Sequence, residues 1–227
     1  MSETRRPFFR IAARIGVGLL TVTVVLLAVL PKHAAELPVG FRTPILAFEF
    51  ARTRGEIEAL FGAQGSAGRA ALVHAMDLGN TIDFVFMLFY SAFLGCFALG
   101  VAGLAGRSYA LVAVVAPIAA IADFCENLQL FAITRALGGT YDDALSRLLV
   151  CTWVKWGGLA LCLVWLSPWL LREGGLERVT GVLAVSTGVL AITAALSRGL
   201  ATEAFSATLS VTFLGIFIVA VRRGRVW

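Results

Sequence analysis

Charged residues are scarce in this chain. Asp, Glu, Lys and Arg make up 15% of its 227 residues, whereas 59% of the residues are hydrophobic. Soluble globular domains contain about 25% charged residues, so this composition excludes a soluble protein and predicts an integral membrane protein whose first partner is the lipid bilayer. Each crossing needs about 20 apolar residues, which leaves no room for a large soluble domain.

Residues that bind metals or act as catalytic groups are also few. The chain has two histidines, His33 and His74, and both lie outside the long apolar runs. One histidine beside carboxylates is a weak metal site, so no metal and no cofactor is predicted. The four cysteines lack paired spacing, and the chain contains no H-E-x-x-H, G-x-S-x-G or P-loop motif. An enzyme is therefore a less favoured class of function, although the sequence leaves it open.

Six apolar segments are long enough to span a bilayer, and the sequence predicts an all-α, polytopic transmembrane bundle that forms a single membrane domain over residues 1–227. Arginines flank the first and last segments, so the positive-inside rule predicts that both termini are cytoplasmic and that the protein resides in the inner cell membrane. The same arginines account for the net charge of +5, and no nucleic-acid partner is expected. The first span lacks a clear cleavage site and should be retained. The expected spans are 12–31, 81–104, 108–135, 148–171, 177–197 and 202–221.

Residues 32–80 form a long external loop with helix signals of its own. Thr43-Pro44 is typical of a helix start, and Thr53 to Glu56 matches a capping box. The sequence therefore predicts two short amphipathic helices. Their apolar residues alternate with charged ones, including Glu49, so they are expected to lie along the outer membrane interface with the charged residues facing away from the lipid. A lid over the bundle is the alternative.

The stretch IADFCENLQLF, residues 121–131, places charged residues inside an apolar helix. Asp123, Glu126 and Asn127 are spaced to share one helical face. Lys155 lies at a similar depth in the next span, and Asp83 enters the second span from the same side. Two unpaired acids are costly inside a bilayer, so we expect Lys155 to be their counter-charge. The expected polar cluster is Asp83, Asp123, Glu126, Asn127 and Lys155, with Asn80, Tyr90, His74 and Asp77 as accessory residues.

Three functions are compatible with this cluster. A structural network between helices is the first interpretation, a proton-coupled or small-solute transporter is the alternative, and a membrane-embedded enzyme acting on lipid is the third. A dry network would favour the structural role, whereas a cavity that reaches the cluster would favour transport. Small-residue stretches such as SAFLG at 91–95 leave open association with a second copy or with another membrane protein.

The segments PILAFEFARTRGEIEALFG (44–62), TIDFVFMLFY (81–90) and ADFCENLQL (122–130) carry a family resemblance. Together they resemble a group of uncharacterised multi-pass membrane proteins from bacteria, and the Asp-x-x-Glu-Asn pattern at Asp123, Glu126 and Asn127 is the most specific element. The resemblance implies that these residues and Asp83 belong together. It implies no activity, substrate or cofactor.

Overall fold

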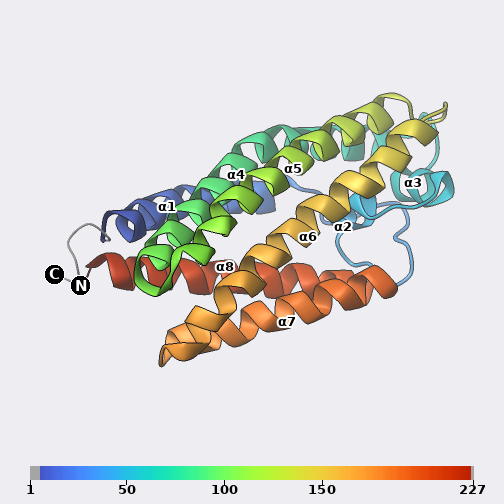
Figure 1. The fold of residues 1–227 in the computed structure, drawn as a ribbon. Helices are drawn as coiled ribbons and strands as arrows, with labels where there is room; N and C mark the ends of the chain where they lie inside the picture. The colour runs from blue at the N-terminus through green and yellow to red at the C-terminus, as the bar shows by residue number, and fades with distance from the viewer. Residues whose placement is uncertain (1–5, 226–227) are drawn as a thin grey trace.

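The computed structural model describes residues 6–225, and every regular element in that range is a helix (Figure 1). The predicted all-α bundle with six long apolar helices is confirmed. The elements are α1 (Arg6–Val29), α2 (Pro44–Glu49), α3 (Arg54–Phe61), α4 (Ala67–Ala105), the short 3-10 helix η2 (Arg107–Leu111), α5 (Val112–Arg135), α6 (Asp142–Arg172), α7 (Leu176–Leu196) and α8 (Leu200–Arg225).

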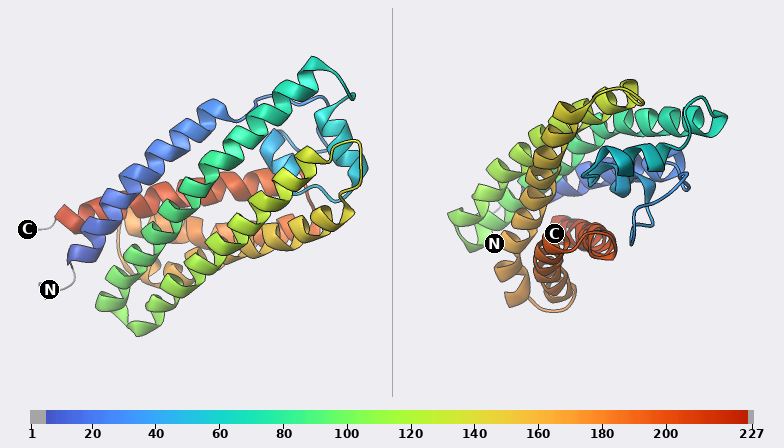
Figure 2. Two further views of the ribbon diagram at one scale, coloured as in Figure 1. Left: turned by 90° about the horizontal axis from the view of Figure 1, so that it is seen from above. Right: turned by 90° about the vertical axis from the view of Figure 1, so that its right-hand side faces the viewer.

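The six long helices are arranged so that chain neighbours pack together. Each of α1, α4, α5, α6 and α7 contacts the next long helix, and α8 returns to α1, so the order closes on itself (Figure 2). The start of α1 and the end of α8 lie at one end of the bundle, whereas α2 and α3 lie at the other. We call residues 32–66, which include α2 and α3, the cap segment.

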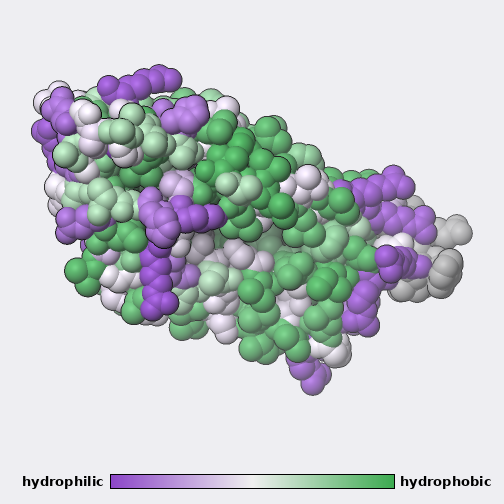
Figure 3. Space-filling model, turned by 180° about the vertical axis from the view of Figure 1, so that it is seen from behind, coloured by the Kyte–Doolittle hydropathy of each residue, from purple (hydrophilic) through white to green (hydrophobic). Residues whose placement is uncertain are grey.

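The outer surface of the bundle is apolar. Large hydrophobic side chains such as Val24, Leu88, Ile121 and Ile192 are more than 60% exposed, which in water would be unfavourable but in a bilayer places them against lipid. Figure 3 shows hydrophobic side chains covering the middle of one face, with hydrophilic ones gathered toward the two ends. This distribution is the one expected of a multi-pass membrane protein.

Several helices begin earlier than predicted, among them α1, which starts at Arg6 rather than near residue 12. α4 starts at Ala67 rather than near residue 81, because Ser66 Oγ accepts a hydrogen bond from the Arg69 backbone N–H and supplies a helix N-cap. The Arg69 side chain is itself buried and donates to Glu58 Oε2 at 2.9 Å. Hydropathy alone places residues 67–80 in the loop, whereas polar contacts to α3 stabilise the start of the helix.

α6 starts at Asp142 rather than near residue 148. Two acidic residues, Asp142 and Asp143, occupy its first turn, where negative charge is favourable for the helix dipole. The apolar run begins only after these charged residues, so hydropathy alone places them in the loop. The error in each case concerns the helix boundary and leaves the number of spans unchanged.

The two short helices of the cap segment are confirmed, but their apolar faces do not meet lipid. Phe48, Ile57 and Phe61 are each no more than 1% exposed, and the rings of Phe48 and Phe61 pack edge to face with centroids 5.0 Å apart. The cap segment therefore packs into the end of the bundle instead of lying along the outer interface. The alternative of a lid describes its position better, because its apolar residues gain more contacts against the helices than at the membrane surface.

Glu56 holds the cap segment in two places. Its Oε2 accepts from the backbone N–H groups of Arg52 and Thr53, which completes the predicted capping box, and its Oε1 accepts from Arg198 Nη2 at 2.7 Å. Burial alone would raise the pKa of Glu56, but the hydrogen bonds from Arg198 and the backbone outweigh burial and lower it. The carboxylate thus joins the start of α3 to the connection between α7 and α8.

Replacing Glu56 by Gln should lower the free energy of unfolding by about 1 kcal/mol at neutral pH, the usual value of a helix cap. Because the pKa is lower in the folded state, this stabilisation is complete above the unfolded pKa and is lost as the pH falls through the folded pKa. Unfolding of Glu56→Gln in detergent at neutral pH and in acid measures the effect. Glu36→Gln, at an exposed position of the same segment, is the control. An equal difference at both pH values would contradict the prediction.

The arginine distribution predicts cytoplasmic termini, and the start of α1 and the end of α8 lie at the same end of the bundle. A cytoplasmic reporter fused after Trp227 should therefore be active. A cysteine introduced at Gln64 in the cap segment, in a chain lacking the native cysteines, should react with a membrane-impermeant thiol reagent from outside intact cells. An active reporter together with labelling of Gln64→Cys only after lysis would refute this topology.

Candidate functional site: a buried charged network beside a cavity

Lys155 lies at the centre of a buried charged network. Its Nζ is 3.0 Å from Asp123 Oδ1, 3.2 Å from Glu126 Oε2 and 3.3 Å from Glu49 Oε1. Asp123 and Glu126 are both 0% exposed. The predicted pairing of Lys155 with these two acids is confirmed. Asp123 and Glu126 belong to α5 and Lys155 belongs to α6, so these ion pairs join two neighbouring helices.

Glu49 was missed as a member of this network. It is the last residue of α2, and its backbone and side chain are both bonded to α6: Thr152 Oγ1 donates to Glu49 O at 3.1 Å and Trp156 Nε1 donates to Glu49 Oε2 at 3.0 Å. The amphipathic pattern predicts that Glu49 lies on the outward charged side of an interfacial helix. That assignment is wrong, because the cap segment turns this carboxylate into the bundle.

Asp83 and Tyr90, on α4, form the third side of the cluster. The Tyr90 hydroxyl donates to Asp123 Oδ2 at 3.0 Å, and Asn127 Nδ2 donates to Asp83 Oδ2 at 2.8 Å. Asp83 is therefore connected to the network through Asn127 and makes no ion pair with Lys155 within residues 6–225. The structure brings together all five residues of the expected cluster, and their geometry defines the candidate site.

The other accessory residues divide into three positions. Asn80 is 3% exposed and lies near Asp83, one turn away on α4. Asp77 accepts a hydrogen bond from Thr134 Oγ1 at 2.9 Å, which ties α4 to the end of α5 outside the network. His74 is exposed and forms no hydrogen bond or ion pair with the described residues.

Helix spacing and close packing explain why α5 and α6 present these groups to each other. Asp123, Glu126 and Asn127 follow the i, i+3, i+4 pattern, and all three side chains are buried. Close approach is allowed at Gly158 of α6, where an added Cβ would be only 3.1 Å from Ala119 Cβ of α5. A larger residue there would push the two helices apart beside the ion pairs.

A cavity of about 540 Å³ adjoins the network. Its lining includes the polar groups Glu49, Asn80, Asp83, Tyr90 and Lys155, whereas Asp123 and Glu126 lie behind Lys155 and do not line it. The remaining lining is largely apolar and comes from α1, α2, α4, α6 and α8 and from the connection between α1 and α2. Ligand pockets typically measure about 300–1,000 Å³ and combine apolar walls with a few polar groups, which describes this cavity.

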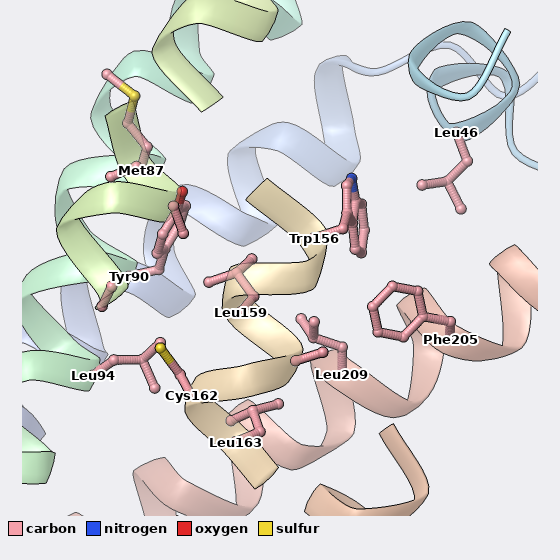
Figure 4. Packing of buried hydrophobic residues seen from close by; sticks show 14 of the residues in the cluster. Leu46, Met87, Tyr90, Leu94, Trp156, Leu159, Cys162, Leu163, Phe205 and Leu209 are labelled. Atoms are coloured by element: carbon pink, nitrogen blue, oxygen red, sulfur yellow. The ribbon is translucent and has the colours of Figure 1, made fainter. Parts of the chain in front are cut away.

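Figure 4 shows Leu46 of α2, Trp156 of α6 and Phe205 of α8 close together, and Leu46 and Trp156 also line the cavity. The Trp156 and Phe205 rings have centroids 5.4 Å apart. Trp156 therefore contacts two elements. Its ring packs against Phe205 of α8, and its indole N–H donates a hydrogen bond to Glu49 of α2. Trp156 lines the cavity on the side of α6, whereas Phe205 does not line it.

Acidic groups outnumber basic ones at the inner end of the cavity. Three carboxyl groups, those of Glu49, Asp123 and Glu126, surround the ammonium group of Lys155, and a fourth, that of Asp83, is linked to them through Asn127. Buried charges are costly unless they are balanced, so the surplus acids favour the presence of protons or of a cationic ligand. In the range 6–225, no three His, Cys, Asp or Glu side chains are arranged to hold a metal ion.

Comparisons of the chain with protein-family models, with curated proteins and with solved structures give no match. The resemblance to uncharacterised bacterial membrane proteins therefore stays a prediction. The class that the structure defines is a multi-pass helical membrane protein with a buried network of Lys155, Glu49, Asp123 and Glu126.

Replacing Lys155 by Met should lower the free energy of unfolding by about 3–5 kcal/mol, because three carboxyl groups lose their shared counter-charge. Adding Glu49→Gln or Asp123→Asn in that background should recover part of the loss, since each removes one uncompensated acid. Reversible unfolding in mixed micelles, analysed as a double-mutant cycle, measures the coupling.

Lys32→Met is the matched control, because Lys32 is the only other lysine, is exposed and makes no ion pair within the described residues. This control should unfold like the parent protein. If Lys155→Met is as stable as the parent, or if its effect simply adds to that of each acid substitution, Lys155 does not hold the network together.

Proposed function

We propose that the protein is a membrane transporter for a small solute, and that the cavity beside the charged network is its binding site. The single observation that supports this proposal is that Glu49, Asp83 and Lys155 face a cavity of about 540 Å³. A network with a purely structural role has no need of such a cavity, and its charges are more stable when other side chains cover them.

The network also has a structural part in this proposal, because it orders the binding site. Lys155 joins α5, α6 and α2, and the bonds from Thr152 and Trp156 hold Glu49 at the cavity wall. A site on rigid helices keeps its polar groups at fixed positions for a ligand. The ion pairs and the binding function are therefore compatible.

The surplus of acids supports coupling to protons. A carboxyl group that releases its proton when a cationic solute arrives keeps the charge of the cavity unchanged, which avoids burying an additional charge. In this scheme one proton leaves for each cation that binds. The titratable or charged groups that face the cavity or lie directly behind its wall are Lys32, Arg42, Glu49, Asp83, Tyr90, Asp123, Glu126, Lys155 and Glu203.

The cap segment supplies a candidate gate at the outer end. Glu203 of α8 accepts hydrogen bonds from the backbone N–H groups of Arg42 and Thr43 at 2.8 Å each and from the Thr43 hydroxyl at 2.7 Å. Arg42, Thr43 and Glu203 all line the cavity. Release of these bonds would free the start of α2 and widen the route to the outside.

Transport can be tested in sealed vesicles that contain the purified protein and an internal pH-sensitive dye. A lipophilic amine, a quaternary ammonium ion, a sugar, an amino acid and a carboxylate are added separately under an imposed pH gradient. At least one of these solutes should drive a proton flux that protein-free vesicles lack. The flux should fall by at least about tenfold in Asp83→Asn, which removes a charge from the cavity wall and keeps an oxygen that can accept from Asn127.

Asp143→Asn is the control for this substitution, since Asp143 is exposed in the first turn of α6 and lies away from the cavity. Its proton flux should equal that of the parent protein. If no solute in the panel gives a protein-dependent flux, or if Asp83→Asn and Asp143→Asn behave alike, the transport proposal fails.

A further inference from the structure

The cavity continues as an apolar groove between α1 and α8. A second, smaller cavity of about 120 Å³ adjoins the first, and both are lined by Phe86, Tyr90, Leu159, Leu209 and Ser210. The smaller cavity extends along α1 to Gly16 and along α8 to Phe217. From Gly16 to Leu27 this groove follows α1 for about 16 Å, since an α-helix rises about 1.5 Å per residue.

α1 and α8 are close at one end and separate toward the other. Near the termini, Arg10 Nε donates to Gly224 O at 2.9 Å, and the Phe217 ring lies so close to Gly16 that an added Cβ would be 2.4 Å from it. Toward the cap segment, the exposed residues Leu27 of α1 and Ala207 of α8 both line the larger cavity. The cavity therefore opens sideways between the two helices.

The sideways opening has a hydrophobic rim. Leu27 of α1 lines the larger cavity and Leu214 of α8 lines the smaller one, and both are exposed hydrophobic residues. Figure 3 shows this face, with a hollow between two areas of hydrophobic side chains and paler, less hydrophobic atoms within it. A rim of this kind meets the hydrocarbon region of the bilayer, so a molecule dissolved in the membrane can enter without crossing water.

The inner end of the groove offers unused polar groups. Asn80 is almost fully buried and lines the cavity, and its Nδ2 has no hydrogen-bond partner among residues 6–225. Asp83 Oδ2 accepts from Asn127, whereas its Oδ1 receives no hydrogen bond from the part of the chain that the structure describes. Lys155 is already surrounded by three carboxylates, so its ammonium group has little capacity to bind a further negatively charged or hydrogen-bond-accepting group. The free carboxylate oxygen and the surplus of acids favour a positively charged partner.

We infer that the ligand is a lipophilic amine, whose ammonium group binds at Asp83 beside the surplus acids and whose hydrocarbon part lies in the groove between α1 and α8. The inference deepens the proposed function, because it rests on the same cavity and names the chemical class of the solute. The groove supplies apolar burial for the chain and the acids supply charge complementarity for the head. Lys32 and Arg42 stand at the outer mouth and would disfavour the approach of a cation by that route.

The test compares ligands that share a chain and differ in the head. Dodecylamine, dodecanol and dodecanoate are added to the protein in a non-ionic detergent, together with the short butylamine, and the quenching of tryptophan fluorescence and the shift in unfolding temperature are measured. Dodecylamine should bind more tightly than the alcohol and the carboxylate by about tenfold or more, the usual advantage of a charge-assisted hydrogen bond. Butylamine should bind far more weakly because it cannot fill the groove.

Two substitutions on α8 test the position of the chain. Ser206→Phe places a ring in the cavity lining and should abolish binding of every dodecyl ligand. Val211 is 51% exposed and lines neither cavity, so Val211→Phe should leave binding unchanged. In Asp83→Asn the preference for the amine over the alcohol should disappear while dodecanol still binds. The ligand comparison in the parent protein does not depend on how well Asp83→Asn folds.

Equal binding of dodecanoate and dodecylamine, or unchanged binding in Ser206→Phe, would overturn the inference. Failure of transport would be seen separately. Selective binding of dodecylamine without any proton flux would contradict the transporter and leave the amine site standing. Proton flux driven only by sugars or carboxylates would support a transporter and overturn the amine as its ligand.

Discussion

The structure depends on the burial of one ammonium group among carboxylates. Lys155 can remain inside an apolar bundle only because Asp123, Glu126 and Glu49 lie within 3.3 Å of its Nζ, and these acids can remain there only because of the lysine. The mutual dependence fixes the relative positions of α2, α5 and α6. Since a buried ion pair requires close geometry, the helices have little freedom to slide or rotate without exposing a charge to lipid.

This constraint also explains the cap segment. A helix of six residues such as α2 has little stability of its own, yet its last residue is bound to α6 by an ion pair and by hydrogen bonds to both its side chain and its backbone. Further along, Glu58 is bonded to Arg69, to the Gly138 backbone and to Tyr141. The segment between the first two spans is therefore a part of the bundle, and it forms the roof of the cavity.

Much of this arrangement could be predicted from the sequence, because the bilayer makes apolar length a reliable signal for a spanning helix. The pairing of Lys155 with Asp123 and Glu126 was also predictable, since their depth in neighbouring spans follows from the topology. The contact of Glu49 with Lys155 was not predictable. A charged residue in an amphipathic loop helix is usually at the surface, and no feature of the neighbouring sequence shows that this loop folds inward. The cavity and the divergence of α1 from α8 depend on packing between the first and last helices. Local sequence patterns do not predict packing between segments so far apart in the chain.

The contact between α1 and α8 has a consequence for biosynthesis. The chain is made from its N-terminus, so α1 enters the membrane first and the helix that completes its surroundings arrives last. Glu49 likewise emerges 106 residues before its partner Lys155, and the two acids of α5 precede it as well. The acids must therefore be sheltered by water or by the insertion machinery while the ribosome completes α6, and the groove exists only once the entire chain has been inserted. A truncated chain that ends before α8 would expose to lipid the surface that, in the finished protein, lines the groove.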